Sequence, residues 1–306
     1  MTLVVLYRGK CGLARCVTRY LMAMTTADLL IVILDLILRR IPVVFSNLFR
    51  FVRALRVCNI HAVLLYAVTD CSVWYTVAFT VDRFVAICCP KLKPKYCTEK
   101  SAAVIIATLT VLFCLKNMFW YFILGDGYTL LHYSWFCYIS NRAFYTPVWM
   151  AFQTLHHVLT PGLPFFLILL LNTLTVRHIL VANRARRRFR DSHGGGRQKD
   201  SEMESRKNSI ILLFVVSGNF IVLWVVFMAS SIYTRIAVDN FVLSTASYYA
   251  QEIGFMLQLL SCCTNTFIYA VTQTNFRKDL QYVLKWPIIR IARSIKCREE
   301  PRNFQH

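Results

Sequence analysis

Six stretches of the chain are long and apolar enough to cross a lipid bilayer as helices. They cover residues 18–38, 57–88, 101–124, 145–181, 208–236 and 243–271. A spanning helix needs about 20 mostly apolar residues, and its backbone groups must bond to one another because lipid offers them no partners. Glycine and proline are scarce, at 10 and 8 of 306 residues, which argues against a turn-rich β-barrel. The sequence therefore predicts an all-α fold, a bundle of transmembrane helices.

Positive charge is abundant, with a net charge of +20, but its distribution argues against a nucleic-acid-binding protein. The basic residues lie between apolar stretches rather than on one soluble surface. Lysine and arginine collect in the cytoplasmic loops of membrane proteins. If the C-terminus is cytoplasmic, so are segments 8–19, 89–100, 182–207 and 272–306, which hold 25 of the 35 lysines and arginines. This bias predicts a multi-pass membrane protein with a cytoplasmic C-terminus.

A short apolar segment, Met1–Tyr7, precedes the six stretches and is too short to cross a bilayer. Counted as one more helix, it places the N-terminus outside, so we expect a seven-helix bundle whose first helix is truncated. We expect residues 1–275 to form this bundle, with a basic third cytoplasmic loop at 182–207. Residues 276–306 are expected to form a cytoplasmic amphipathic helix and tail, with the helix lying against membrane lipids.

Segment 39–56 departs from the charge rule, because it carries five arginines on the predicted outer side. It could bind an acidic ligand or lipid headgroups, or it could be a solvated surface. Asp35 lies four residues before Arg39, a spacing that favours a local ion pair on a helix.

Ionisable residues inside spans are costly and usually functional. Asp28 lies in the middle of the first long stretch, and Asp82-Arg83 ends the second on the cytoplasmic side. Asp70 lies inside the second stretch, where it could bind a ligand amine or pair with another buried group such as Lys116. The pair His156-His157 has no carboxylate at helical spacing, so polar lining or core is a better interpretation than a metal site.

Three short motifs, each on its own helix, carry a family resemblance. Ala-Asp-Leu surrounds Asp28, Asp82-Arg83-Phe84 follows, and Asn265 and Tyr269 form Asn-x-x-x-Tyr in the last stretch. In order and spacing the chain resembles the rhodopsin-like (class A) G-protein-coupled receptors. The run from Val73 to Cys88 is most similar to the orphan group around probable G-protein-coupled receptor 139.

The resemblance implies a plasma-membrane receptor that binds an extracellular small molecule or peptide and activates heterotrimeric G proteins. The residues implied as the G-protein switch are Asp82, Arg83, Phe84, Asn265 and Tyr269. Those implied as the activation relay are Phe220, Trp224 and Pro164. A sodium pocket is implied at Asp28, Ser72, Ser261 and Asn265. A ligand pocket is expected to include Leu65, Tyr66, Asp70, Phe227, Glu252 and Phe255. A disulfide is implied between Cys58 and Cys137.

Some positions depart from the family pattern. Val225 follows Trp224 where a proline is usual, Asn172 replaces a common tyrosine, and Thr266 replaces a proline. Other functions remain open: a transporter or channel, or a truncated receptor fragment that does not signal. We expect no enzymatic activity, because the sequence has no His-rich metal motif, no Gly-x-Ser-x-Gly and no acidic catalytic pair. The one cofactor implied is an allosteric sodium ion.

Overall fold

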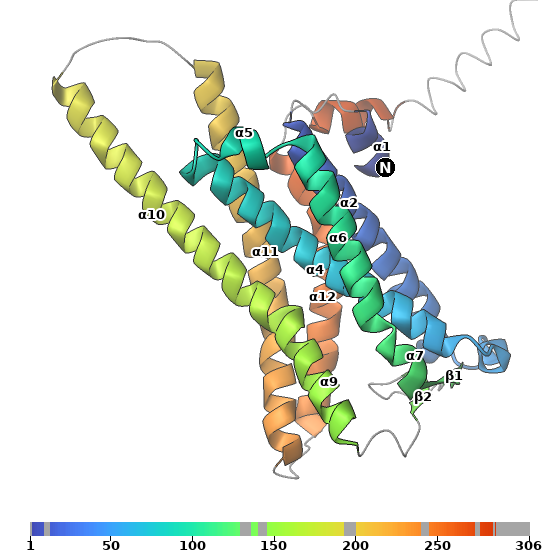
Figure 1. Cartoon of the computed structure of the whole chain (residues 1–306). Helices are drawn as coiled ribbons and strands as arrows, with labels where there is room; N and C mark the ends of the chain where they lie inside the picture. Colours follow the sequence, from blue (N-terminus) through green and yellow to red (C-terminus); the bar gives the residue numbers. More distant parts are fainter. Residues whose placement is uncertain are drawn as a thin grey trace, which may run out of the picture.

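The computed structural model describes residues 2–8, 13–128, 136–139, 146–192, 200–239, 245–272, 276–283 and 285. Its helices form a bundle of long, roughly aligned rods (Figure 1). Within the described residues, six helices are long and apolar enough to cross a membrane. They are Arg15–Val44, Cys58–Cys88, Glu99–Ile123, Pro147–Ala182, Ile210–Tyr233 and Tyr249–Thr272. The predicted all-α transmembrane bundle is therefore confirmed.

The spans are numbered from the short helix Thr2–Tyr7, which takes the place of a first span, so Arg15–Val44 is the second span, Cys58–Cys88 the third and Pro147–Ala182 the fifth. Short helical turns link the second span to the third. The elements in this part are α1 (Thr2–Tyr7), α2 (Arg15–Ile31), the π-helix η1 (Val32–Arg40), α3 (Ile41–Val44), the 3₁₀-helix η2 (Arg50–Ala54) and α4 (Cys58–Cys88). The six-residue α1 buries Val5 and Leu6 against α2.

The rest of the chain adds four spans and a small outer hairpin. The elements are α5 (Lys93–Tyr96), α6 (Glu99–Asn117), α7 (Phe119–Ile123), β1 (Leu124–Tyr128), β2 (Cys137–Ile139), α9 (Pro147–His157), the π-helix η3 (Val158–Gly162), α10 (Leu163–Ser192), α11 (Asp200–Asp239) and α12 (Thr245–Thr272). Residues 276–283 are helical as well, and Phe276 at their start is fully buried against Tyr269.

Helix α4 is the centre of the bundle, because it contacts α2, α6, α10 and α11. Its apolar side chains Val73 and Phe79 are almost completely buried. Tyr75 is bonded to Thr110 of α6 through their hydroxyl groups, at 2.6 Å. A central helix of this kind can carry polar residues at several depths, since its neighbours supply their partners.

The helix formed by the first long apolar stretch, residues 18–38, extends further than the sequence predicts. It was expected to end at residue 38, but η1 and α3 carry it to Val44. Arg39 and Arg40, expected in an outer loop, lie in this helix with only 9% of their surface exposed. The expected end was wrong because both arginines have acidic partners: Asp35, one turn earlier, pairs with both, and Glu252 of α12 also pairs with Arg40.

The fifth span is interrupted at Thr160–Pro161. Thr160 has non-helical dihedral angles (φ −152°, ψ 109°), and Pro161 follows with no backbone N–H to donate. Pro164, the proline that the family resemblance singles out, instead lies in regular helix as the second residue of α10. The irregularity of this span therefore lies three residues before Pro164.

The predicted disulfide is present and anchors the outer hairpin to the centre of the bundle. Cys58, the first residue of α4, is bonded to Cys137, the first residue of β2. Strand β2 pairs with β1 in antiparallel register, with Tyr128 opposite Cys137. The hairpin is thereby fixed above the outer ends of the helices.

Candidate functional site

At the cytoplasmic end of α4, Arg83 is folded back on its neighbour Asp82. Arg83 Nε donates to Asp82 Oδ2 at 3.0 Å, and Nη2 contacts the same oxygen. Nη2 also lies 3.5 Å from the sulfur of Cys16 on α2. Both charged residues are buried, with 7% of Asp82 and 6% of Arg83 exposed, whereas Phe84 is half-buried. In this arrangement the guanidinium is directed into the bundle and is not available at the cytoplasmic surface.

In the middle of the bundle, Asp28 joins three helices. Its Oδ1 accepts from the hydroxyl of Ser72 on α4 at 2.7 Å. Its Oδ2 accepts from the amide of Asn265 on α12, also at 2.7 Å. Only 4% of Asp28 is exposed. The family resemblance implied a shared pocket for Asp28, Ser72 and Asn265, and the structure brings these three side chains together, although the resemblance gave no information about which oxygen each partner binds.

Ser261 lies beside this cluster but is bonded to another residue. Asn219 of α11 donates its amide to the Ser261 hydroxyl at 3.3 Å and accepts from Thr264 at 2.9 Å. Asn219 therefore links α11 to α12, and it was missed in the sequence. Its signal was an amide inside the otherwise apolar run 210–230.

A small polar cavity lies next to Asp28, and its size and donors suit a single ion or water. Its volume is about 10 Å³, close to that of one water-sized sphere. Ser72, Ser261 and Asn265 also border it. A carboxylate with hydroxyl and amide oxygens is a donor set that hard cations accept. Within the described residues no group of three or more His, Cys, Asp or Glu could hold a metal ion, so a transition-metal centre is not indicated there.

Trp224 of α11 is the wall between this cavity and a second one nearer the outside. It borders both cavities and is 3% exposed. Phe220, one turn away on the same helix, stacks on it with ring centroids 5.0 Å apart. Phe227, on the outer side, meets it edge to face at 6.1 Å. Pro164 is buried at the start of α10 and borders neither cavity.

The outer cavity has a volume of about 60 Å³ and lies between α4, α9, α11, α12 and the end of the second span. Four of the six residues expected in a ligand pocket border it: Leu65, Tyr66, Phe227 and Phe255. The sequence suggested a polar lining only for the pair His156-His157, yet seven polar residues border the cavity: Asp35, Arg39, Thr69, His156, His157, Thr160 and Gln258.

Asp70 does not border the outer cavity, which corrects its inclusion in the ligand pocket. It is fully buried, and its Oδ2 accepts from Lys116 at 2.7 Å and from Asn117 at 2.5 Å. The Lys116 ammonium also lies 3.2 Å from Nδ1 of His156, which does border the cavity. Of the two alternatives for Asp70, the structure therefore contains the internal pair with Lys116.

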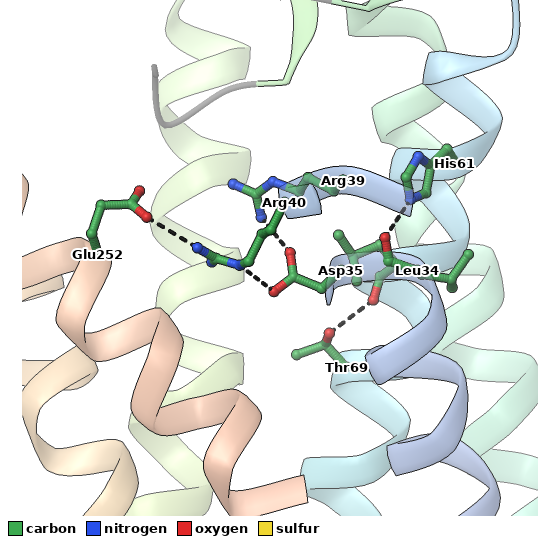
Figure 2. Close-up of polar contacts among 8 residues, drawn as sticks. Leu34, Asp35, Arg39, Arg40, His61, Thr69 and Glu252 are labelled. Carbon is green, nitrogen blue, oxygen red and sulfur yellow. Dashed lines mark hydrogen bonds and ion pairs between the residues drawn. The ribbon is translucent and has the colours of Figure 1, made fainter. Parts of the chain in front are cut away.

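Glu252 does not border the outer cavity either, and it too is held by an arginine (Figure 2). Arg40 Nη1 donates to Glu252 at 3.0 Å and its Nε donates to Asp35 at 2.8 Å. Arg39 donates to the other oxygen of Asp35 at 2.9 Å, so the expected Asp35–Arg39 pair is present. Two guanidinium groups and two carboxylates thus join the second span to α12 at the outer end of the bundle.

His61 provides a further link between α4 and the second span (Figure 2). Its Nε2 lies 2.9 Å from the carbonyl oxygen of Leu34, which can only accept, so Nε2 carries the proton. Its Nδ1 lies 3.2 Å from the hydroxyl of Tyr128 in the outer hairpin, which is then the donor. This link is not visible in the sequence because it joins residues of three separate elements.

The fold and these sites define a class of protein: a multi-pass helical membrane protein with buried polar centres at three depths along one central helix. Residues 1–269 match the family described as "7 transmembrane receptor (rhodopsin family)". Because this match covers most of the chain, the chain belongs to the rhodopsin family of seven-transmembrane receptors.

Proposed function

We propose that this chain is a plasma-membrane receptor that binds an extracellular small molecule or peptide and activates heterotrimeric G proteins. One observation carries the proposal: Trp224 is shared by the outer cavity and the Asp28 cavity. A ligand that displaces this ring from above would change the surroundings of Asp28 and Asn265 below. The orphan group around probable G-protein-coupled receptor 139 is the subfamily that we propose.

The arrangement of Arg83 at the cytoplasmic end of α4 supports the same mechanism. Arg83 is paired with Asp82 and buried, which fits a resting state in which the G-protein contact is withheld. We infer that the active state releases Arg83 towards the cytoplasm when α11 moves outward, with Asn265 and Tyr269 repacking. A ligand shifts this equilibrium only by as much as it binds the active state better. Aromatic walls at Tyr66, Phe227 and Phe255 suit an apolar ligand body.

The Asp28 cavity is the place where a sodium ion would bind in this proposal. Asp28, Ser72 and Ser261 would supply oxygen ligands, and Asn265 would hold the carboxylate in position. When bound, the ion would supply positive charge beside Asp28 and would favour the packing in which Ser72 and Asn265 converge on it.

Expression of the chain in cells that carry G-protein reporters, screened against ligand pools, tests the function. We expect a ligand-dependent response that Arg83→Ala abolishes at equal surface expression. Arg15→Ala is the matched control, because Arg15 is an arginine at the cytoplasmic end of a neighbouring helix and its side chain is 89% exposed. A response that survives Arg83→Ala unchanged would contradict the mechanism. A chain that reaches the surface and gives no response to any pool would favour the non-signalling alternative.

A further inference from the structure

A large groove lies between the inner halves of α10 and α11, and none of the buried carboxylates Asp28, Asp35, Asp70 and Asp82 borders it. Its volume is about 740 Å³, and the two helices diverge along it (Figure 1). Apolar side chains form most of its walls. They are Leu169, Val176 and Leu180 on α10, and Phe214 and Ile221 on α11.

Two arginines line the cytoplasmic half of this groove, Arg184 at its end and Arg177 near its middle. Arg177 and Arg184 are seven residues apart on α10, which places them on one face two helical turns apart. Both are exposed, and neither forms an ion pair with another residue of the described ranges. No acidic side chain borders the groove in the described part of the chain. The groove therefore combines an apolar wall with uncompensated positive charge in its cytoplasmic half.

The length of the groove matches one leaflet of a bilayer. From Leu169 to Arg184 the helix rises roughly 22 Å, at about 1.5 Å per residue. Half of a bilayer, including its headgroups, is roughly 20–22 Å thick. With Arg184 at the cytoplasmic headgroups, Leu169 therefore lies near the middle of the membrane, and the apolar walls cover the depth of one set of acyl chains.

Two further features show that the groove is not simply a smooth lipid-facing surface. The amide oxygen of Asn172, which borders the groove, is buried and has no hydrogen-bond partner among the described residues. Asn172 lies five residues, or roughly 7 Å, deeper than Arg177. On the facing helix, Gly218 borders the groove, and a Cβ atom placed there would have nothing within 4 Å. The groove thus has a polar position at mid-depth and unfilled space opposite it.

We propose that this groove binds one anionic phospholipid of the cytoplasmic leaflet. An acyl chain lies between α10 and α11 in the space beside Gly218. The phosphate lies between Arg177 and Arg184, and the amide N–H of Asn172, deeper in the groove, donates to an ester carbonyl oxygen of the lipid. The charge of the site selects the anionic headgroup, since basic residues at the cytoplasmic surface attract anionic lipids. A second copy of the chain or a peptide would be a different occupant, which the experiment below distinguishes.

The test is lipid retention by the purified full-length chain, measured by native mass spectrometry. The probes are phosphatidylserine and phosphatidylcholine with identical acyl chains. We expect the unmodified chain to retain one phosphatidylserine in preference to phosphatidylcholine. Each of Arg177→Gln and Arg184→Gln should lower this preference about fivefold, the effect of about 1 kcal/mol per basic residue near the surface. Lys91→Gln is the control, because Lys91 is an exposed cytoplasmic lysine outside the groove.

A second variant tests the apolar part of the site. Gly218→Phe should fill the space and reduce retention of both lipids, whereas Val222→Phe should not, because Val222 lies on the same helix, 66% exposed and outside the groove. If Gly218→Phe does not give monodisperse protein, the headgroup preference of the two arginine variants decides alone.

Three results would overturn the proposal. The first is that the unmodified chain retains phosphatidylserine and phosphatidylcholine equally, as the double variant Arg177→Gln/Arg184→Gln does. The second is full displacement of the lipid by glycerophosphoserine, which has the headgroup without acyl chains. The third is a dimer mass that Gly218→Phe converts to a monomer, which would assign the groove to a second copy of the chain.

Discussion

The buried pair of Asp70 and Lys116 allows a quantitative test of how this bundle holds charge. Asp70 has a fully buried side chain, and that of Lys116 is 13% exposed. Lys116→Met keeps a long apolar stem but leaves the carboxylate with Asn117 as its remaining partner. Removing one partner of a buried pair typically costs about 3–5 kcal/mol, since the other charge stays buried and unpaired.

The opposite change should cost less. Asp70→Asn preserves the shape of the side chain and leaves Lys116 partly solvated and close to His156. We therefore expect a cost of about 1–2 kcal/mol. The double variant removes both charges together and should cost about 1 kcal/mol or less, because replacing a complete buried pair is often neutral. The resulting coupling energy is at least about 3 kcal/mol, at or above the upper end of values measured for residues in contact.

Thermal unfolding of the purified chain in one detergent measures this cycle. For a domain of this size, 1 kcal/mol corresponds to about 2 °C, so Lys116→Met should lower the melting temperature by about 6 °C or more. The double variant should recover most of that loss. Lys100→Met is the control, because Lys100 is exposed at the start of the same helix. The reasoning is refuted if Lys116→Met and Lys100→Met have the same melting temperature. It is also refuted if the destabilisation of the double variant equals the sum of the two single effects.

Three further predictions use the same measurements or simple chemistry. Asp35→Asn should lower the free energy of unfolding by about 3–5 kcal/mol, because it leaves two buried guanidinium groups without their shared carboxylate. Glu252→Gln should lower it by about 1 kcal/mol or less, since the Glu252 side chain is 27% exposed. Equal melting temperatures of the two variants would contradict this. Gly254→Ala should destabilise the chain by about 1–3 kcal/mol, because its Cβ would lie 2.7 Å from the backbone of Phe227. Gly218→Ala should be neutral or stabilising. A lower melting temperature for Gly218→Ala than for Gly254→Ala would refute the close packing of α11 and α12. Burial and the nearby carboxylate of Asp82 raise the pKa of the Cys97 thiol from 9.0 to about 12. Because only the thiolate reacts, a variant that keeps Cys97 as its one free thiol should be alkylated at pH 8 about 10³-fold more slowly than a peptide thiol. Equal alkylation rates would contradict the burial of Cys97.

The parts of the fold that could be predicted are those that a single segment determines. Each spanning helix needs its own apolar length, so the six stretches were visible in the sequence and recur in the structure. The family resemblance also implied that Asp28, Ser72 and Asn265 lie together, and the structure joins them by hydrogen bonds. The disulfide between Cys58 and Cys137 followed from the same resemblance.

The parts that could not be predicted depend on pairs from distant segments. An arginine is costly in lipid, so the sequence suggested a helix end before Arg39, yet the partners of Arg40 include Glu252, 212 residues later. The location of the break in the fifth span at Thr160 was equally hidden, because Pro161 and Pro164 both lie in the same apolar run. Asp70 could be assigned to a ligand or to Lys116 only when α4 and α6 were placed side by side.

Asp28 differs from the other buried carboxylates of the described residues. Asp35, Asp70 and Asp82 each form an ion pair with an arginine or lysine, whereas the partners of Asp28 among the described residues are the neutral side chains of Ser72, Asn265 and Cys262. A buried carboxylate without a countercharge is expensive, so either a bound cation or a proton must balance it.

A bound sodium ion and a bound proton predict different effects of sodium concentration and pH on agonist affinity. If a sodium ion balances Asp28, agonist affinity should fall as sodium replaces an equal concentration of a large organic cation, and Asp28→Asn should remove this dependence. Asp126→Asn is the control, because Asp126 is an outer carboxylate whose side chain is 49% exposed. If a proton balances it, affinity should respond to pH but not to sodium. A sodium effect that persists in Asp28→Asn would place the ion elsewhere and would remove the cation from the proposed mechanism.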